Sequence, residues 1–95
     1  MIGKQKRFLR ALGTGIDPVV HIGKGGVTDN VLYQIDEALE ARELIKVKVL
    51  QNYGDDPKNV ARELAEATDA EMVQVVGRNF LLYRRSMQRS VIELP

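Results

Sequence analysis

The sequence predicts a single α/β domain in which three helices pack against a mixed four-stranded sheet. One reason is that its apolar residues alternate between a helical period and a strand period of two, in the order α-β-α-β-α-β-β. Another is a hairpin-sized connection between the last two strands, which adds an antiparallel strand to strands that are otherwise joined by helical crossovers. The chain has 95 residues, which leaves little room for a second domain.

The first expected helix spans residues 4–12 and ends at the glycines of positions 13 and 15. Three apolar side chains share one of its faces, and four basic side chains occupy the rest. The apolar residues are Phe8, Leu9 and Leu12, and the basic residues are Lys4, Lys6, Arg7 and Arg10. The pair Asp17-Pro18 then favours an extended chain, and residues 19–22 have the pattern of a short strand.

The second expected helix begins directly after a glycine-rich loop. Thr28 is a suitable N-cap, and apolar residues follow it at helical spacing as far as Leu39. Four acidic residues make up much of its solvent side, namely Asp36, Glu37, Glu40 and Glu43. From residue 44 to residue 50 the period changes to two, which places Lys46 and Lys48 together on one face of a strand.

The third expected helix starts at Asp56-Pro57, with aspartate as the N-cap and proline at the first helical position. It ends near Thr68, and two strands follow at residues 72–76 and 80–83. Between these strands lies the connection Gly77-Arg78-Asn79. Residues 86–95 are polar apart from a short apolar patch, and we expect them either to pair weakly or to form a mobile tail.

The composition disfavours several classes of function. There is no cysteine, and His21 is the only histidine, so thiolate and histidine metal sites and Ser-His-Asp triads lack their components. No apolar run approaches the roughly 20 residues of a membrane span, and the first residues have no apolar core of a secretory leader. We therefore expect a cytoplasmic, monomeric protein that is not an enzyme, has no catalytic residues, and needs no metal or cofactor.

The most informative motif is Gly23-Lys24-Gly25-Gly26, a G-x-x-G loop between a strand and a helix. Glycine allows close approach of a ligand, and free amides before a helix N-terminus suit an anion such as phosphate. Lys24 adds a positive charge on a flexible stem. The motif lacks the Ser or Thr that follows the lysine of a P-loop, and Thr28 stands where a dinucleotide fingerprint requires its third glycine. A tight turn without a ligand is the simpler alternative.

Charge is segregated along the chain. Residues 1–27 carry five basic side chains against one aspartate, whereas residues 28–45 carry five acidic side chains against one arginine. A second group of basic residues comprises Lys46 and Lys48 on one strand face, with Arg78, Arg84 and Arg85 around the closing hairpin. Basic faces bind polyanions, but the charge pattern by itself favours the simpler interpretation that it keeps the protein soluble. We expect Tyr83 at the edge of the core, so a base-stacking sheet surface is absent and recognition of backbone or shape is better supported.

Four segments carry a resemblance to a known family, namely Gly3–Arg10, Ile22–Thr28, Ala38–Val47 and Val75–Arg84. They resemble the CRM domain (chloroplast RNA splicing and ribosome maturation), and most closely its stand-alone bacterial form, the YhbY-like RNA-binding proteins. The likeness extends over nearly the whole chain. It implies a fold similar to the C-terminal domain of a bacterial translation initiation factor, RNA binding through the G-x-x-G loop, and association with precursors of the large ribosomal subunit.

We therefore predict a ribosome assembly factor that binds rRNA of the large-subunit precursor. The expected RNA-binding residues are Gly23, Lys24, Gly25 and Gly26 in the loop, Lys4, Lys6, Arg7 and Arg10 in the first helix, and Lys46, Lys48, Arg78 and Arg84. The alternative is a protein-interaction adaptor that binds a ribosomal protein with the acidic helix face of residues 36–43. A DNA-binding regulator is disfavoured because no helix carries clustered base-reading residues.

Overall fold

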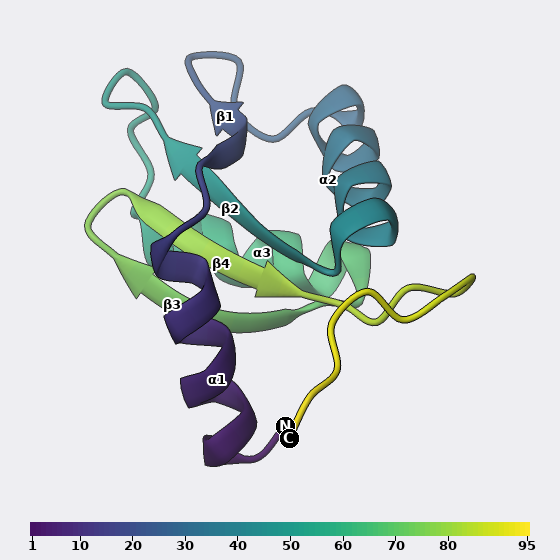
Figure 1. Ribbon diagram of the computed structural model, residues 1–95. Helices are drawn as coiled ribbons and strands as arrows, with labels where there is room; N and C mark the ends of the chain where they lie inside the picture. Colours follow the sequence, from purple (N-terminus) through teal and green to yellow (C-terminus); the bar gives the residue numbers. More distant parts are fainter.

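A computed structural model describes residues 1–95 and confirms the α/β class and the predicted order of elements (Figure 1). The elements are α1 (Gly3–Thr14), β1 (Pro18–Ile22), α2 (Asp29–Arg42), β2 (Leu44–Val49), α3 (Pro57–Thr68), β3 (Glu71–Val76) and β4 (Asn79–Tyr83). Both predicted N-caps are present, because the Thr28 hydroxyl accepts from the Val31 amide at 3.2 Å and the Asp56 carboxylate accepts from the Lys58 amide at 3.0 Å. The helix starts that the sequence marks are therefore set by local chemistry.

The four strands form one mixed sheet in the order β1-β2-β4-β3. The neighbours β1 and β2 are parallel and are joined through α2, while β4 is antiparallel to both β2 and β3. The last strand of the chain thus inserts between β2 and β3 (Figure 1). This insertion keeps the closing hairpin intact and places β4 in the middle of the sheet, where its apolar residues are buried on both faces.

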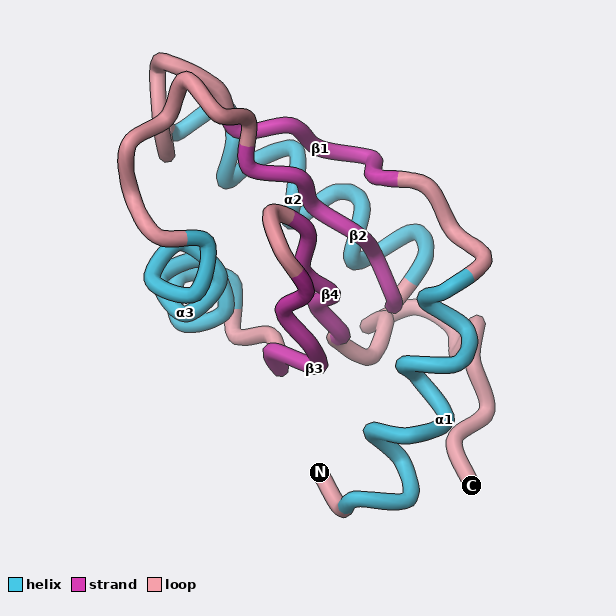
Figure 2. The backbone as a smooth tube through the Cα atoms, turned by 90° about the vertical axis from the view of Figure 1, so that its left-hand side faces the viewer, coloured by secondary structure: helices cyan, strands magenta, loops and turns pink.

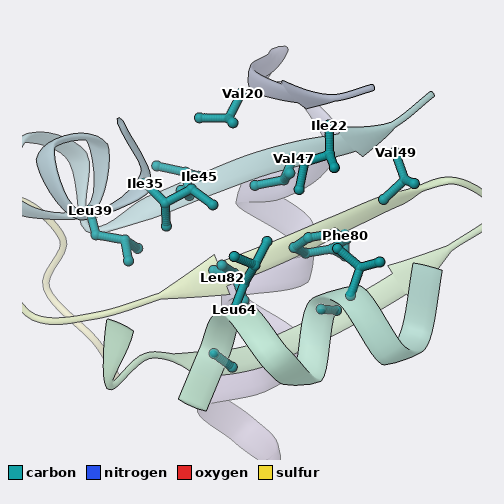
Figure 3. Packing of buried hydrophobic residues seen from close by; sticks show 13 residues of the cluster. Val20, Ile22, Ile35, Leu39, Ile45, Val47, Val49, Leu64, Phe80 and Leu82 are labelled. Carbon is teal, nitrogen blue, oxygen red and sulfur yellow. The ribbon is translucent and has the colours of Figure 1, made fainter. Parts of the chain in front are cut away.

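Helices α2 and α3 cover one face of the sheet and enclose the main core (Figure 3). This core comprises 13 buried residues, namely Val20, Ile22, Ile35, Leu39, Ile45, Val47, Val49, Val60, Ala61, Leu64, Ala65, Phe80 and Leu82. The strand residues in it alternate along β1 and β2, as a period of two requires. The opposite side chains of these strands, including Lys46 and Lys48, therefore point to the other face of the sheet.

Helix α1 packs on that other face and covers only part of it, on the side of the sheet away from α3 (Figure 2). Leu9 is its fully buried apolar side chain, whereas Phe8 and Leu12 remain 37% and 41% exposed. Gly13 lies inside the helix and touches the sheet, since a Cβ there would stand 2.3 Å from Leu81 Cδ1. The missing side chain allows the helix to approach β4 closely. Because α1 covers only part of this sheet face, the rest of the face is open.

The segment after β4 is held by two glutamates of the second helix region. Glu43 is fully buried and ends α2 with a φ of 67°, and its carboxylate accepts hydrogen bonds from the amides of Ser86, Val91 and Ile92 at 2.6–2.7 Å. Glu40 accepts from the Ser86 hydroxyl and from further amides of the same segment. Downstream, Ile92 and Leu94 pack against the small cluster around Leu9. The tail thus covers the end of α1 rather than the open sheet face.

Candidate nucleic-acid interface

The G-x-x-G loop is a turn at the end of β1. The Gly26 amide donates to the Gly23 carbonyl at 2.9 Å, which leaves Lys24 and Gly25 at the exposed tip. The amides of Lys24, Gly25 and Val27 donate to no group of the protein. Three unpaired amides and a free ammonium group therefore lie within a few residues of one another, which is the arrangement that a phosphate oxygen needs.

The three glycines of the loop differ in what the fold demands of them. Gly26 has a φ of +70° and is buried, and a Cβ there would stand 2.8 Å from the Tyr53 ring. A Cβ on Gly23 would meet Leu50 at 3.4 Å, which is tight but tolerable. A Cβ on Gly25 would meet nothing within 4 Å. The fold explains glycine at position 26, but it does not explain glycine at position 25.

Gly26→Ala is expected to lower the free energy of unfolding by about 1–2 kcal/mol, because a residue with a Cβ is strained at this positive φ. The contact with the Tyr53 ring adds to that cost. Thermal unfolding followed by circular dichroism measures it, with Gly25→Ala as the matched control that leaves Tm unchanged or slightly raised. Equal melting temperatures for the two variants would contradict this assignment.

The turn of residues 50–53 supports the loop from below, and the two lie side by side at one end of the molecule (Figures 1 and 2). Arg78 holds this turn, since its guanidinium donates to the carbonyls of Val49, Leu50 and Tyr53 at 2.7, 2.9 and 3.3 Å. The Leu50 amide in turn donates to the Ile22 carbonyl at 2.8 Å. Arg78 thus stabilises the base of the loop, a role that sequence reasoning missed because these contacts join residues 25–29 positions apart.

The N-terminus of α2 is a weaker anion site than the sequence suggested. Thr28 already caps the Val31 amide, and Asp29 places a negative charge in the first turn of the helix. A carboxylate there stabilises the helix dipole but repels a second anion. Any phosphate is therefore better accommodated at the tip, beside Lys24 and Gly25, than on the helix axis.

The open part of the sheet face carries basic side chains. His21 pairs in register with Lys48, and Lys48 pairs with Asn79, so these three form one row across β1, β2 and β4. Lys46 lies in the next row and lines a pocket together with Thr14 at the C-terminal end of α1. Lys48 is exposed and Lys46 is half-buried. The row leads from α1 towards the end of β1 where the G-x-x-G loop begins.

The basic residues of α1 lie at the other end of β1 from the loop (Figure 1). Lys4 and Arg7 are exposed, and Lys6 and Arg10 are half-buried. The structure contains a single ion pair, between Arg84 and Asp36, so none of these four side chains is neutralised by a carboxylate. Lys46, Lys48 and Lys24 likewise have no carboxylate partner.

Arg84 is placed differently from the other expected residues. Its guanidinium donates to the Asp36 carboxylate at 2.6 Å and to the Thr68 carbonyl at 2.9 Å, which ties β4 to α2 and α3. The acidic face of α2 is largely used in the same way, since Asp36, Glu40 and Glu43 all have internal partners. Glu37 is the only carboxylate of residues 36–43 without one, although the Asp36 side chain remains 58% exposed.

Hydrogen bonding lowers the pKa of both glutamates that hold the tail. For Glu40 the Met87 amide is the main cause, followed by the Ser86 hydroxyl. For Glu43, burial by itself raises the pKa, but the three backbone amides outweigh burial and the net pKa lies below its ordinary value of 4.5. Burial raises the pKa of Tyr83 above 10.0. These shifted groups hold the structure together and lie outside the loop and the open sheet face.

No group of three or more His, Cys, Asp or Glu side chains is placed to hold a metal ion. None of the three helices is both long and apolar enough to cross a membrane. The candidate site consists of the loop tip, Lys46 and Lys48 on the open sheet face, and the basic residues of α1.

Comparisons with known proteins agree with this architecture. A family model described as the CRS1/YhbY (CRM) domain matches residues 1–84. The chain is 50% identical over 95 residues to the "Probable RNA-binding protein YqeI" of Bacillus subtilis, covering 100% of this chain and 99% of that relative. It is 39% identical over 92 residues to an "RNA-binding protein" of Haemophilus influenzae, covering 97% and 92% of the two chains.

A solved structure shows the same fold. The solution structure of a hypothetical protein from Staphylococcus aureus superimposes with a TM-score of 0.83 at 55% sequence identity, and the match covers 100% of this chain and 99% of that one. The curated relatives are named as RNA-binding proteins and not as enzymes. This chain belongs to the CRS1/YhbY (CRM) domain family.

Proposed function

We propose that this protein is a non-enzymatic RNA-binding protein that binds rRNA of the large-subunit precursor during ribosome assembly. One observation carries the assignment of the site: the tip of the G-x-x-G loop, Lys24 and Gly25, has no role in the fold. Its amides are unpaired, its ammonium group is free, and the space above Gly25 is open. The names of the relatives support RNA as the ligand. The protein acts as a cytoplasmic monomer under this proposal.

The chemistry of the tip suits a phosphodiester backbone. Unpaired amides at the tip donate to phosphate oxygens, and Lys24 follows the charge on its flexible stem. Such contacts position the RNA and supply affinity, but they carry no direct sequence information. Binding through the loop alone is therefore expected to depend strongly on salt and weakly on sequence.

The footprint extends from the tip over the open sheet face to α1. Lys46 and Lys48 face the open sheet surface, and Lys4, Lys6, Arg7 and Arg10 follow along α1. The guanidinium groups of Arg78 and Arg84 are instead occupied by internal hydrogen bonds. We therefore assign Arg78 to the positioning of the loop and Arg84 to the packing of α2 and α3 against the sheet.

Lys24→Ala tests the phosphate contact. The variant is expected to bind a short single-stranded RNA more weakly than the parent protein, with the slope of log affinity against log salt reduced by about 1. Lys58→Ala, an exposed lysine at the start of α3, is the matched control and leaves both quantities unchanged. Because Lys24 has no internal partner, Tm stays constant. Unchanged affinity and slope in a folded Lys24→Ala variant would exclude the contact.

Association with large-subunit precursors is tested separately, in cell extract treated with ribonuclease. The proposal predicts that the protein sediments with large particles and is released when the RNA is digested. An adaptor that binds a ribosomal protein would remain associated after digestion. The structure favours release, because three of the four carboxylates on the helix face of residues 36–43 already have internal partners.

A further inference from the structure

The open part of the sheet face contains a pocket of about 320 Å³ between the C-terminal end of α1 and the β3–β4 hairpin. Val76, Phe80 and Leu81 give it an apolar lining, and the remaining side chains that line it are polar. These are Thr14, Lys46, Gln74 and Asn79, with no carboxylate among them. Its volume is at the lower end of the range for small-molecule sites, which is about 300–1,000 Å³.

Asn79 lines this pocket and has a buried side-chain oxygen that the fold leaves without a hydrogen bond. Its Oδ1 is the only buried side-chain polar atom in the protein without a hydrogen-bond partner. The residue pairs in register with Lys48 and Val76 and lines the pocket. A buried amide oxygen without a partner destabilises the fold, so its presence requires a reason other than stability. Rotation about the last side-chain bond exchanges the positions of this oxygen and the amide nitrogen, and Asn79 lines the pocket with this side chain.

Gln74 presents a second uncommitted amide to the same pocket. It is half-buried on β3, pairs in register with Leu81, and its side chain donates and accepts no hydrogen bond within the protein. Asparagine and glutamine amides are the side chains that pair with the donor and acceptor edge of adenine. Two such amides can hydrogen-bond to the edge of a planar base while the neighbouring apolar surface packs against the face of its ring.

We infer that this pocket binds one unstacked adenine base of the RNA, with Asn79 and Gln74 on its edge and Leu81 and Val76 against its ring. Lys46, which lines the same pocket, is placed to meet the adjoining phosphate. The inference rests on the proposed function and adds to it the choice of base. The loop contacts the RNA backbone, whereas the pocket discriminates among bases.

Titration of the ¹⁵N-labelled protein with the four 5′-mononucleotides AMP, CMP, GMP and UMP tests the pocket directly by NMR. We expect the side-chain amide signals of Asn79 and Gln74 to shift with AMP, and AMP to bind about tenfold more tightly than UMP. Asn79→Leu and Gln74→Leu each reduce this ratio towards one. Asn79→Leu also keeps or raises Tm, because it removes the unpaired oxygen.

Two results would overturn the inference. One is the absence of shifts at Asn79 and Gln74 with all four nucleotides, and the other is a base preference that survives both leucine substitutions. Lys24→Ala distinguishes this inference from the proposed function. If Lys24→Ala weakens RNA binding while the pocket shows no base preference, the loop contacts the RNA but the pocket does not select adenine. If the parent protein prefers AMP but Lys24→Ala has no effect on RNA binding, the pocket binds the base and the loop does not contact the RNA.

Discussion

Gly25→Asp is expected to weaken RNA binding at least about tenfold without destabilising the fold. The added side chain occupies the space above the tip, and its carboxylate repels the phosphate that the tip amides would bind. Stability is preserved because a Cβ at this position meets nothing within 4 Å and the backbone has no positive φ there. A surface change of this kind alters the free energy of unfolding by less than about 0.5 kcal/mol.

Electrophoretic mobility shift or fluorescence anisotropy with a short RNA measures this loss, and thermal unfolding confirms the fold. Gly25→Ala separates the two causes, because it adds the side chain without the charge and should give an intermediate affinity. Ala67→Asp adds the same charge on an exposed position of α3, on the opposite side of the sheet, and should bind like the parent protein. A Gly25→Asp variant with parental affinity would show that RNA does not approach the tip.

Glu43→Gln is expected to have the largest effect on stability, lowering the free energy of unfolding by at least about 2 kcal/mol. One carboxylate oxygen accepts from the amides of Val91 and Ile92, and the other accepts from Ser86. Glutamine has only one acceptor oxygen, so its NH₂ group faces either the Ser86 amide or the other two. A donor is then left opposite a donor in a fully buried site.

Thermal unfolding of Glu43→Gln at neutral pH should show a fall in Tm of about 10 °C. Glu37→Gln, on an exposed position of the same helix without internal partners, is the matched control and should unfold like the parent protein. Hydrogen exchange at Val91 and Ile92 reports the tail itself. The mobility of residues 86–95 stays a prediction from the sequence. If the amides of Val91 and Ile92 are protected from exchange in the parent protein and lose that protection in Glu43→Gln, Glu43 holds the segment in place.

Stability should also depend on pH through the same carboxylates. Because folding lowers the pKa of Glu40 and Glu43 below 4.5, their contribution is fully present above about pH 4.5 and is lost as the pH falls through the folded values. Protonated Glu43 resembles glutamine at this site, so the difference in Tm between the parent protein and Glu43→Gln should narrow in acid. A difference that stays constant down to pH 3 would contradict the role of the charge.

Local patterns predicted the elements well because local chemistry sets their ends. Thr28 and Asp56 cap their helices as the sequence indicated, and the alternation along residues 44–49 placed Lys46 and Lys48 opposite the core. The exposed loop tip also follows from its four residues. In each case the residues that decide the structure lie within one or two turns of one another.

Contacts between distant segments account for what the sequence did not reveal. Arg78 and Arg84 look like further surface cations in the sequence, but their partners lie 16–48 positions away along the chain. Glu43 fits the pattern of a solvated helix face, although it is buried against the tail. Insertion of β4 between β2 and β3 creates these juxtapositions, and no local pattern specifies that order.

RNA binding through the loop and the open sheet face can be tested in cells by ultraviolet crosslinking, with sequencing of the bound RNA and mass spectrometry of the crosslinked peptides. We expect rRNA of the large subunit as the crosslinked RNA, and crosslinked peptides that contain the loop of residues 23–26 or the strand of residues 44–49. Crosslinks that fall instead on α2 or α3, or an RNA population without rRNA of the large subunit, would contradict it.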